Sequence, residues 1–132
     1  MSYDIFIQFH KGKDFVNMPK RDILKWITGK ITPSSYDCTR IEYDGLNDCE
    51  IYMDEGDETS CVNVHRPCGS RLFDDILNIL KNTPGVLYFV DIPGIYYAND
   101  NITESDIPDD MLETLGKMIK VSKSDDLAKL LE

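Results

Sequence analysis

The sequence lacks any apolar run approaching the roughly 20 residues that a helix needs to cross a bilayer. It also lacks a cationic segment ahead of an apolar one near its start, where an acid already stands at Asp4, so we expect no signal peptide. These absences favour a cytoplasmic protein, in which cysteines normally stay reduced. The chain contains four of them: Cys38, Cys49, Cys61 and Cys68.

Motifs for nucleotide or metal binding are missing as well. The eight glycines form neither G-x-G-x-x-G nor G-x-x-x-x-G-K-[ST], which argues against a dinucleotide site and against a P-loop. No paired C-x-x-C supports a zinc site. Residues 44–48 and 54–58 do not match the D-x-[DN]-x-[DN]-G pattern of a calcium loop. We therefore expect no cofactor and no metal ion.

Basic residues are absent from one long stretch in the middle of the chain. The net charge is −10, from 24 acidic and 14 basic residues. Residues 42–58 contain no Lys or Arg but eight carboxylates: Glu42, Asp44, Asp48, Glu50, Asp54, Glu55, Asp57 and Glu58. Negative charge concentrated in this way attracts a basic partner and repels nucleic acid and anionic membranes. Because no catalytic motif competes with it, binding to another protein is the first hypothesis.

The hydrophobic pattern predicts how the acidic stretch is held. Strands are expected over 39–43, 49–53 and 61–65, joined by tight turns that contain glycine and acids. Alternation along the second of these strands directs three residues inward: Cys49, Ile51 and Met53. Glu50 and Tyr52 then point outward. Acids presented by a sheet lose less conformational entropy on binding than acids on a flexible tail.

Tyrosines strengthen the prediction of a binding surface. Tyr43 and Tyr52 lie among the acids, and protein interfaces favour Tyr as an anchor while carboxylates at the rim steer the encounter. Tyr96 and Tyr97 are consecutive, so on a strand they point to opposite faces and one of them should be exposed. The exposed one would extend the binding surface.

The remaining elements alternate between helices and strands in a single domain, residues 1–132. Helices are expected over about 19–28, 71–82, 105–116 and from 124 onward, and strands over 3–10, 86–90, 95–98 and 118–121. Ser70 is expected to cap the second helix, with Asp74 and Asp75 in its first turns, where the helix dipole favours anions. Hairpins without a regular βαβ repeat predict an α+β fold, a mixed, largely antiparallel sheet with helices packed on it.

A small thiol-dependent enzyme is an alternative hypothesis. Cys68 comes just before an expected helix, beside Arg66 and Arg71 and close to His65. Helix N-termini and cations lower the pKa of a thiol and make it nucleophilic. The spacing matches no protease or phosphatase signature, and the plain alternative is a strand-to-helix turn whose residues are basic and small. A generic acidic adaptor or regulatory subunit is a further alternative.

Several short stretches resemble a known group of proteins. They are residues 62–67 (VNVHRP), 72–77 (LFDDIL), 86–89 (VLYF), 107–111 (IPDDM), 115–116 (LG) and 121–127 (VSKSDDL). Together they resemble small acidic immunity proteins of bacterial contact-dependent growth inhibition and other polymorphic toxin systems, over roughly the C-terminal half of the chain. The resemblance implies a cytosolic, non-enzymatic inhibitor of a cognate toxin domain, often a nuclease and commonly basic because it must bind phosphates. It assigns no catalytic or contact residues.

The leading hypothesis from the sequence is therefore a non-enzymatic protein that neutralises a basic toxin, commonly a nuclease, through an acidic surface. Eight residues are predicted to contact the partner: Asp44, Asp48, Glu50, Tyr52, Asp54, Glu55, Asp57 and Glu58. Tyr52 is expected to be the anchor, with Asp44 and Asp48 at the edge. No catalytic residue and no direct contact with nucleic acid or membrane is expected, and the sequence carries no signal for an oligomeric state.

Overall fold

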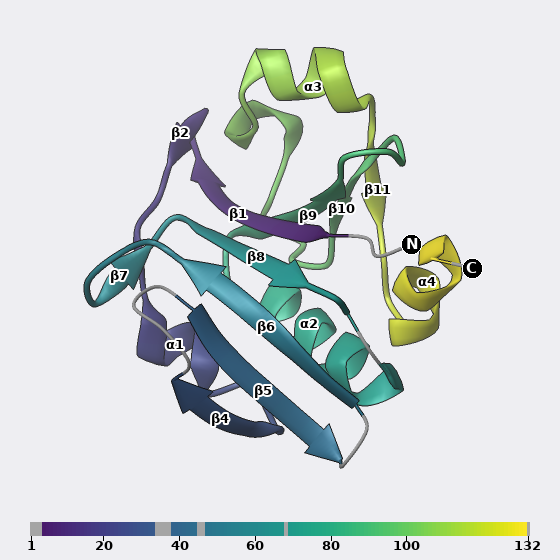
Figure 1. The fold of residues 1–132 in the computed structure, drawn as a ribbon. Helices are drawn as coiled ribbons and strands as arrows, with labels where there is room; N and C mark the ends of the chain where they lie inside the picture. The colour runs from purple at the N-terminus through teal and green to yellow at the C-terminus, as the bar shows by residue number, and fades with distance from the viewer. Residues whose placement is uncertain (1–3, 34–37, 45–46, 68, 132) are drawn as a thin grey trace.

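The computed structural model describes residues 4–33, 38–44, 47–67 and 69–131. Its main feature is a nine-stranded sheet (Figure 1), in which eight strands lie in the order β11-β10-β9-β1-β8-β6-β5-β4 and β2 pairs with β1. A separate pair joins β3 to β7. The strands are β1 (Ile5–Lys11), β2 (Asp14–Phe15), β3 (Met18–Pro19), β4 (Lys30–Pro33), β5 (Cys38–Asp44), β6 (Asn47–Met53), β7 (Glu58–Thr59), β8 (Cys61–His65), β9 (Gly85–Phe89), β10 (Ile95–Tyr97) and β11 (Met118–Lys120).

The sheet is mixed and largely antiparallel, which confirms the predicted α+β fold. All pairings of the described strands are antiparallel except that of β10 with β11, which is parallel. The helices are α1 (Lys20–Leu24), α2 (Gly69–Asn82), α3 (Asp109–Leu115) and α4 (Ser124–Ala128), with short 3-10 helices η1 (Glu104–Asp106) and η2 (Lys129–Leu131). In the described ranges, no helix has the length and apolar character needed to span a bilayer.

The main core lies between α2 and one face of the sheet, with α2 behind the strands in Figure 1. The predicted apolar stripe of α2 is buried: Leu72, Phe73, Ile76, Leu77 and Leu80. Alternate residues of β1 are buried against it: Ile5, Ile7 and Phe9. α2 begins at Gly69, so Ser70 lies within its first turn and not at the predicted cap. Full burial of one such side chain stabilises the fold by about 1.5–3 kcal/mol. The packing of α2 on the sheet therefore holds in place the strands that carry the acids.

A smaller second core forms on the opposite face of the sheet, beside β9, β10 and β11. Neighbouring residues of β9 point to opposite sides, so that Leu87 enters the main core and Val86 enters the second one. Ile95 joins Val86 from β10, and Ile102 and Ile107 come from the segment before α3. The prediction that β9 is covered on both faces is confirmed.

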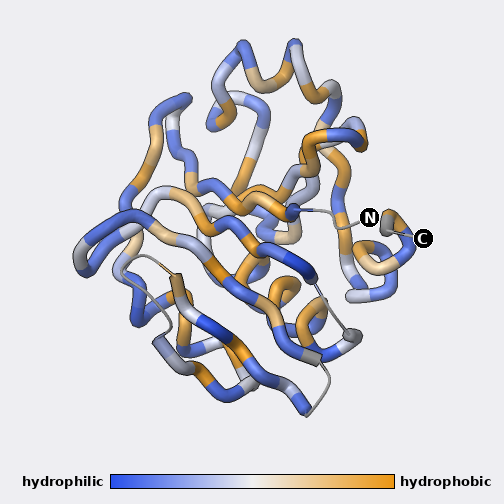
Figure 2. The backbone as a smooth tube through the Cα atoms, in the orientation of Figure 1, coloured by the Kyte–Doolittle hydropathy of each residue, from blue (hydrophilic) through white to orange (hydrophobic). Residues whose placement is uncertain are grey.

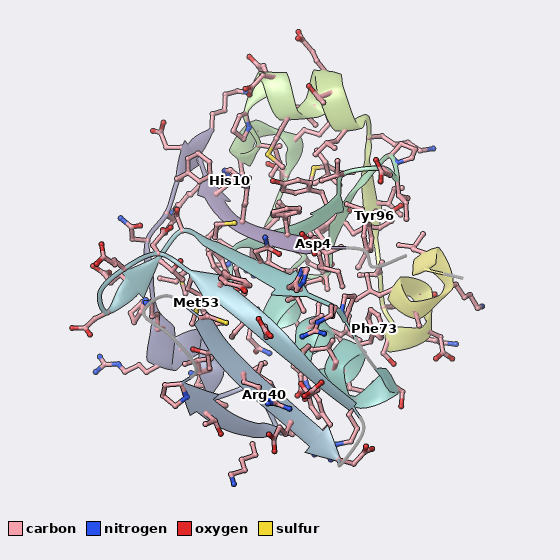
Figure 3. All side chains as sticks on the ribbon, viewed as in Figure 1. Asp4, His10, Arg40, Met53, Phe73 and Tyr96 are labelled. Carbon is pink, nitrogen blue, oxygen red and sulfur yellow. The ribbon has the colours of Figure 1, made fainter. Side chains whose placement is uncertain are left out.

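The rest of this opposite face, over β1, β8, β6 and β5, has no helix of the described residues above it, and we call it the open face. Its side chains are mostly half-buried or exposed: Phe6, Gln8, Arg40, Glu42, Glu50, Tyr52, Cys61, Asn63 and His65. Figure 3 labels Arg40 on this face and Phe73 on α2, on the other side of the sheet. Phe6, an apolar residue on this face between buried Ile5 and Ile7, stacks its ring on that of Tyr88 at a centroid distance of 5.2 Å.

Asp75 has a different role from the predicted one in the helix dipole. It is 2% exposed, and its carboxylate accepts hydrogen bonds from the backbone N–H of Thr28 at 2.8 Å and the hydroxyl of Tyr43 at 2.6 Å. The helix expected over 19–28 is shorter in the structure: α1 covers five residues, Lys20–Leu24, and Thr28 lies beyond its end and bonds to Asp75. Tyr43 is 9% exposed and belongs to the main core, so of the two tyrosines among the acids only Tyr52 is exposed.

Gly29 should not tolerate even one added methyl group. A Cβ at this position would lie 2.7 Å from Ile41 Cγ2 and 3.0 Å from the carbonyl oxygen of Glu42. Ile41 is fully buried and the carbonyl belongs to a paired strand, so neither moves cheaply. Gly29→Ala should therefore lower the free energy of unfolding, measured in urea, by about 1–3 kcal/mol. The control Lys30→Ala, at an exposed neighbour, should change it by less than about 0.5 kcal/mol. Equal stability of Gly29→Ala and wild type would contradict the close packing.

Candidate partner-binding surface

Of the eight predicted contact residues, Glu50 and Tyr52 lie within β6, and the other six divide between the two ends of one hairpin. Asp44 lies at the end of β5, whereas the acids that follow β6 lie at the opposite end of the hairpin (Figure 1). Since β6 contains seven residues, the two ends are about 20 Å apart. We call residues 54–58 the acidic loop. The predicted acids therefore form two groups joined by a strand, not one continuous wall.

The acids on the strands are largely matched by the protein's own arginines. Arg40 of β5 forms an ion pair with Asp48 and a second with Glu42, the latter at 3.4 Å. Arg66 lies 3.1 Å from Glu50. The two ion pairs of Arg40 follow from the strand register. Arg40 is aligned with Glu50 on β6, so Asp48, two residues from Glu50, and Glu42, two residues along β5, are both within its reach. The net field of this part of the surface is thereby weaker than the sequence predicted.

The acidic loop differs, because most of its charge is not matched. All five of its residues are exposed, and Figure 2 shows this loop as a hydrophilic stretch. Within the described part of the chain, the side chains of Glu55, Asp57 and Glu58 make no hydrogen bond or ion pair. Lys20 and Arg21 border the same cavity of about 640 Å³ as Asp57 and Glu58, without pairing with them. Three carboxylates thus remain open to an outside cation.

The base of the acidic loop is fixed by hydrogen bonds. Asp54 accepts bonds from the backbone N–H and the hydroxyl of Ser60 at 3.0 and 3.1 Å. The N–H of Asp54 donates to Thr59 Oγ1 at 3.0 Å, and Thr59 itself is fully buried. On the other side, the N–H of Lys20 donates to the carbonyl of Asp57 at 2.9 Å. The loop therefore loses little conformational freedom when a partner binds.

Tyr52 lies on the open face as predicted, and its orientation is fixed. It is 36% exposed, while the inward neighbours Ile51 and Met53 are buried, which confirms the predicted alternation. Its hydroxyl donates to Glu50 at 2.9 Å, and the ring meets that of His65 edge-on at 6.4 Å. The bond to the carboxylate raises the pKa of Tyr52 to about 12 and, chiefly through the same bond, lowers the pKa of Glu50.

Tyr52→Phe should raise the pKa of the Glu50 carboxyl, because it removes the hydroxyl that favours the ionised form. Arg66 and Cys38 remain beside Glu50, so part of the lowering should persist. Carbon-13 NMR of the Glu50 carboxyl during an acid titration measures this pKa. Tyr88→Phe is the matched control, since the Tyr88 hydroxyl bonds to Gln8 and not to Glu50. An unchanged pKa in Tyr52→Phe would contradict the contact.

The structure gives only part of the proposed thiol site. Cys68 lies outside the described residues, while Nδ1 of His65 is 2.8 Å from a carboxylate oxygen of Asp4. Of the described cysteines, Cys38 and Cys49 are buried, and burial, followed by the charge of Asp54, raises the pKa of Cys61. A raised pKa disfavours the reactive thiolate. The described residues contain no group of three or more side chains that could hold a metal ion.

Several features of this surface were missed by sequence reasoning. Phe15 is 59% exposed on β2, a strand that was not predicted. Gly12 and Lys13 both adopt positive φ, of 58° and 72°, and join β1 to β2 in a two-residue turn. A glycine followed by a polar residue between two pairs of strand residues was the available signal for this hairpin. Of the consecutive tyrosines, Tyr96 is 4% exposed and Tyr97 packs half-buried against the second core.

Comparisons with known proteins add no relative. The chain matches no protein-family model, no curated protein and no solved structure.

Proposed function

We propose that this chain is a non-enzymatic, cytoplasmic immunity protein that binds and neutralises a cognate toxin domain, a basic nuclease. The observation that carries the proposal is the acidic loop, in which Glu55, Asp57 and Glu58 are exposed and unpaired within the described residues. A net charge of −10 supports it, because the whole molecule attracts a cationic partner. The resemblance to acidic immunity proteins points in the same direction.

The proposed mechanism is occupation of the toxin's cationic groups by carboxylates. A nuclease holds its substrate with Lys and Arg side chains that contact phosphates. Carboxylates of the acidic loop form charge-assisted hydrogen bonds with the same donors, and a bound protein then excludes nucleic acid from them. No chemical step is required of the inhibitor. Tyr52 supplies apolar contact area near these charges, and its fixed ring reduces the entropy lost on binding.

The acids of the open face have a secondary part in this proposal. Asp48 and Glu50 already pair with Arg40 and Arg66, so replacing these internal partners by those of a toxin gains little Coulomb energy. Together with Asp44, they help to orient the toxin at the rim of the interface. Asp54 acts through its bonds to Ser60, which hold the loop in place.

Co-expression with a toxin domain encoded next to this gene tests the proposal, which also predicts that such a gene is present there. Induction of the toxin alone should stop growth of a bacterial host, and simultaneous expression of this chain should restore it. The purified proteins should form a complex, and the complex should lack the nuclease activity of the free toxin. Continued growth arrest, with no complex at micromolar concentration, would refute the proposed function.

A further inference from the structure

A groove lies on the open-face side of the molecule, between β2 and α3. It encloses about 510 Å³, within the roughly 300–1,000 Å³ typical of ligand pockets. Its apolar lining is Phe15, Tyr88, Pro108, Met111 and Leu115. Phe15 is 59% exposed, so a large aromatic ring is presented to solvent at the edge of an apolar hollow. A well-packed apolar hollow is where interfaces place the single side chain that dominates binding energy.

Both walls of the groove are held in position. The backbone N–H of Gly12 donates to Asp106 Oδ1 at 3.0 Å, and the N–H of Lys13 donates to the carbonyl of Asp106 at 3.0 Å. The ammonium of Lys13 lies 2.5 Å from Asp109, at the start of α3. The turn between β1 and β2 is therefore tied to the segment that carries α3. Because the walls of the groove are already in place, binding a side chain there costs little conformational entropy.

The floor of the groove is also fixed. The side-chain amide of Gln8 donates to the hydroxyl of Tyr88 at 2.9 Å, and the Tyr88 ring stacks on Phe6. Gln8 in turn is 3.1 Å from Nε2 of His10, whose ring lies 4.8 Å from that of Phe15. His10 is only 1% exposed, so Phe15 rests on a rigid support while its outer side stays open.

The charges around the groove favour a basic partner. Lys13 is paired with Asp109, whereas Asp110 lines the groove and has no ion pair within the described residues. Asp14 is exposed next to Phe15. A second copy of this chain is a poor occupant, because two molecules of net charge −10 repel each other. A partner with lysines or arginines beside its apolar anchor matches these groups.

The groove and the acidic loop are close enough to belong to one interface. Phe15 is four residues before Pro19, which pairs with Glu58 in the β3–β7 pair. Four residues span at most about 14 Å, which is well within the size of one interface. Figure 1 shows β2 and β7 along one edge of the fold. Cys61 gives a second link, because it pairs with Gln8 of the groove and lies near Asp54.

We propose that this groove receives a bulky aromatic or aliphatic side chain of the partner, carried in a segment whose neighbouring residues are Lys or Arg. The inference rests on the proposed function, which supplies a basic protein as the partner, and adds the specific anchor that the acidic loop alone does not provide. Carboxylates of the loop steer and hold the cations, while Phe15, Tyr88 and Met111 bury the anchor.

Short peptides test this inference without the toxin. The probe is Lys-Lys-Trp-Lys-Lys, with Lys-Lys-Ala-Lys-Lys and Glu-Glu-Trp-Glu-Glu as matched controls, titrated into protein labelled at Met and Leu methyl groups. We expect the first peptide to shift the Met111 and Leu115 methyl signals and to bind at least about tenfold more tightly than either control. Equal binding of the Trp and Ala peptides, or methyl shifts elsewhere only, would overturn the inference.

Two variants complete the test. Phe15→Ser should weaken binding of the Trp peptide by about tenfold or more, because it removes an exposed wall of the groove. Val90→Ser is the matched control, since Val90 is 70% exposed but lies outside the groove lining, and it should leave binding unchanged. Equal effects of the two variants would also overturn the inference. If the Trp peptide binds the groove but co-expression does not restore growth, only the proposed function is refuted. If co-expression restores growth but the peptide does not bind the groove, only the proposed anchor site is refuted.

Discussion

Replacing Glu55, Asp57 and Glu58 together by Lys should slow association with the proposed basic toxin domain by about one to three decades at low salt. These three carboxylates lie together in the acidic loop and make no ion pair within the described residues, so they contribute strongly to the field that steers a cation to this surface. Their side chains are exposed, so the fold should be retained. Stopped-flow measurement of the association rate at several salt concentrations tests this, and the salt dependence should fall along with the rate.

The control for this variant carries the same change in net charge at another place. Asp74, Asp91 and Asp125 are exposed and lie outside the acidic loop, the open face and the groove lining. Their simultaneous replacement by Lys should slow association much less, because steering depends on where the charge lies as well as on its sum. Equal slowing by the two triple variants would show that only net charge matters, and would contradict the assignment of the acidic loop.

Asp75→Ala should lower the free energy of unfolding by about 2–4 kcal/mol. The substitution leaves the backbone N–H of Thr28 and the hydroxyl of Tyr43 without their acceptor at a site that is 2% exposed in the wild type. Buried donors without a partner cost about 1–3 kcal/mol each, and two donors lose their acceptor here. Urea denaturation measures the change.

The neighbouring residue provides the control for Asp75. Asp74 is exposed on the same helix, so Asp74→Ala should change the free energy of unfolding by less than about 0.5 kcal/mol. Tyr43→Phe should reproduce part of the loss in Asp75→Ala, because it removes one of the donors. A loss below 1 kcal/mol in Asp75→Ala would mean that this carboxylate does not join α2, the segment after α1 and β5 as the structure indicates.

Local patterns in the sequence predicted much of the fold. Alternation along β6 correctly directed Ile51 inward and Tyr52 outward, because the period of two belongs to the strand itself. The helical spacing of apolar residues predicted the buried stripe of α2 for the same reason. The class of the sheet followed from the order of these elements, since short hairpin connections favour antiparallel neighbours.

Contacts between residues that lie far apart in the sequence could not be predicted from these local patterns. Asp75 looks like an ordinary first-turn acid, and its burial depends on Thr28, which is 47 residues away in sequence. The pairing of Asp48 with Arg40 depends on the register of β5 and β6. In the sequence the eight carboxylates of residues 42–58 look like one group. In the fold, the acids after β6 are more accessible to a partner than those on the strands. The groove was missed because its two walls are almost 100 residues apart along the chain, as the hydrogen bond from Gly12 to Asp106 illustrates.

A map of the surface that the proposed toxin domain covers tests the acidic loop and the groove most directly. Amide NMR spectra of the labelled chain, recorded without and with one equivalent of unlabelled toxin domain, give this map residue by residue. If the acidic loop and the groove form the interface, the largest changes fall on residues 54–58, on Tyr52 and on the groove around Phe15. Changes confined to α2 and α4, with the acidic loop unaffected, would contradict this assignment.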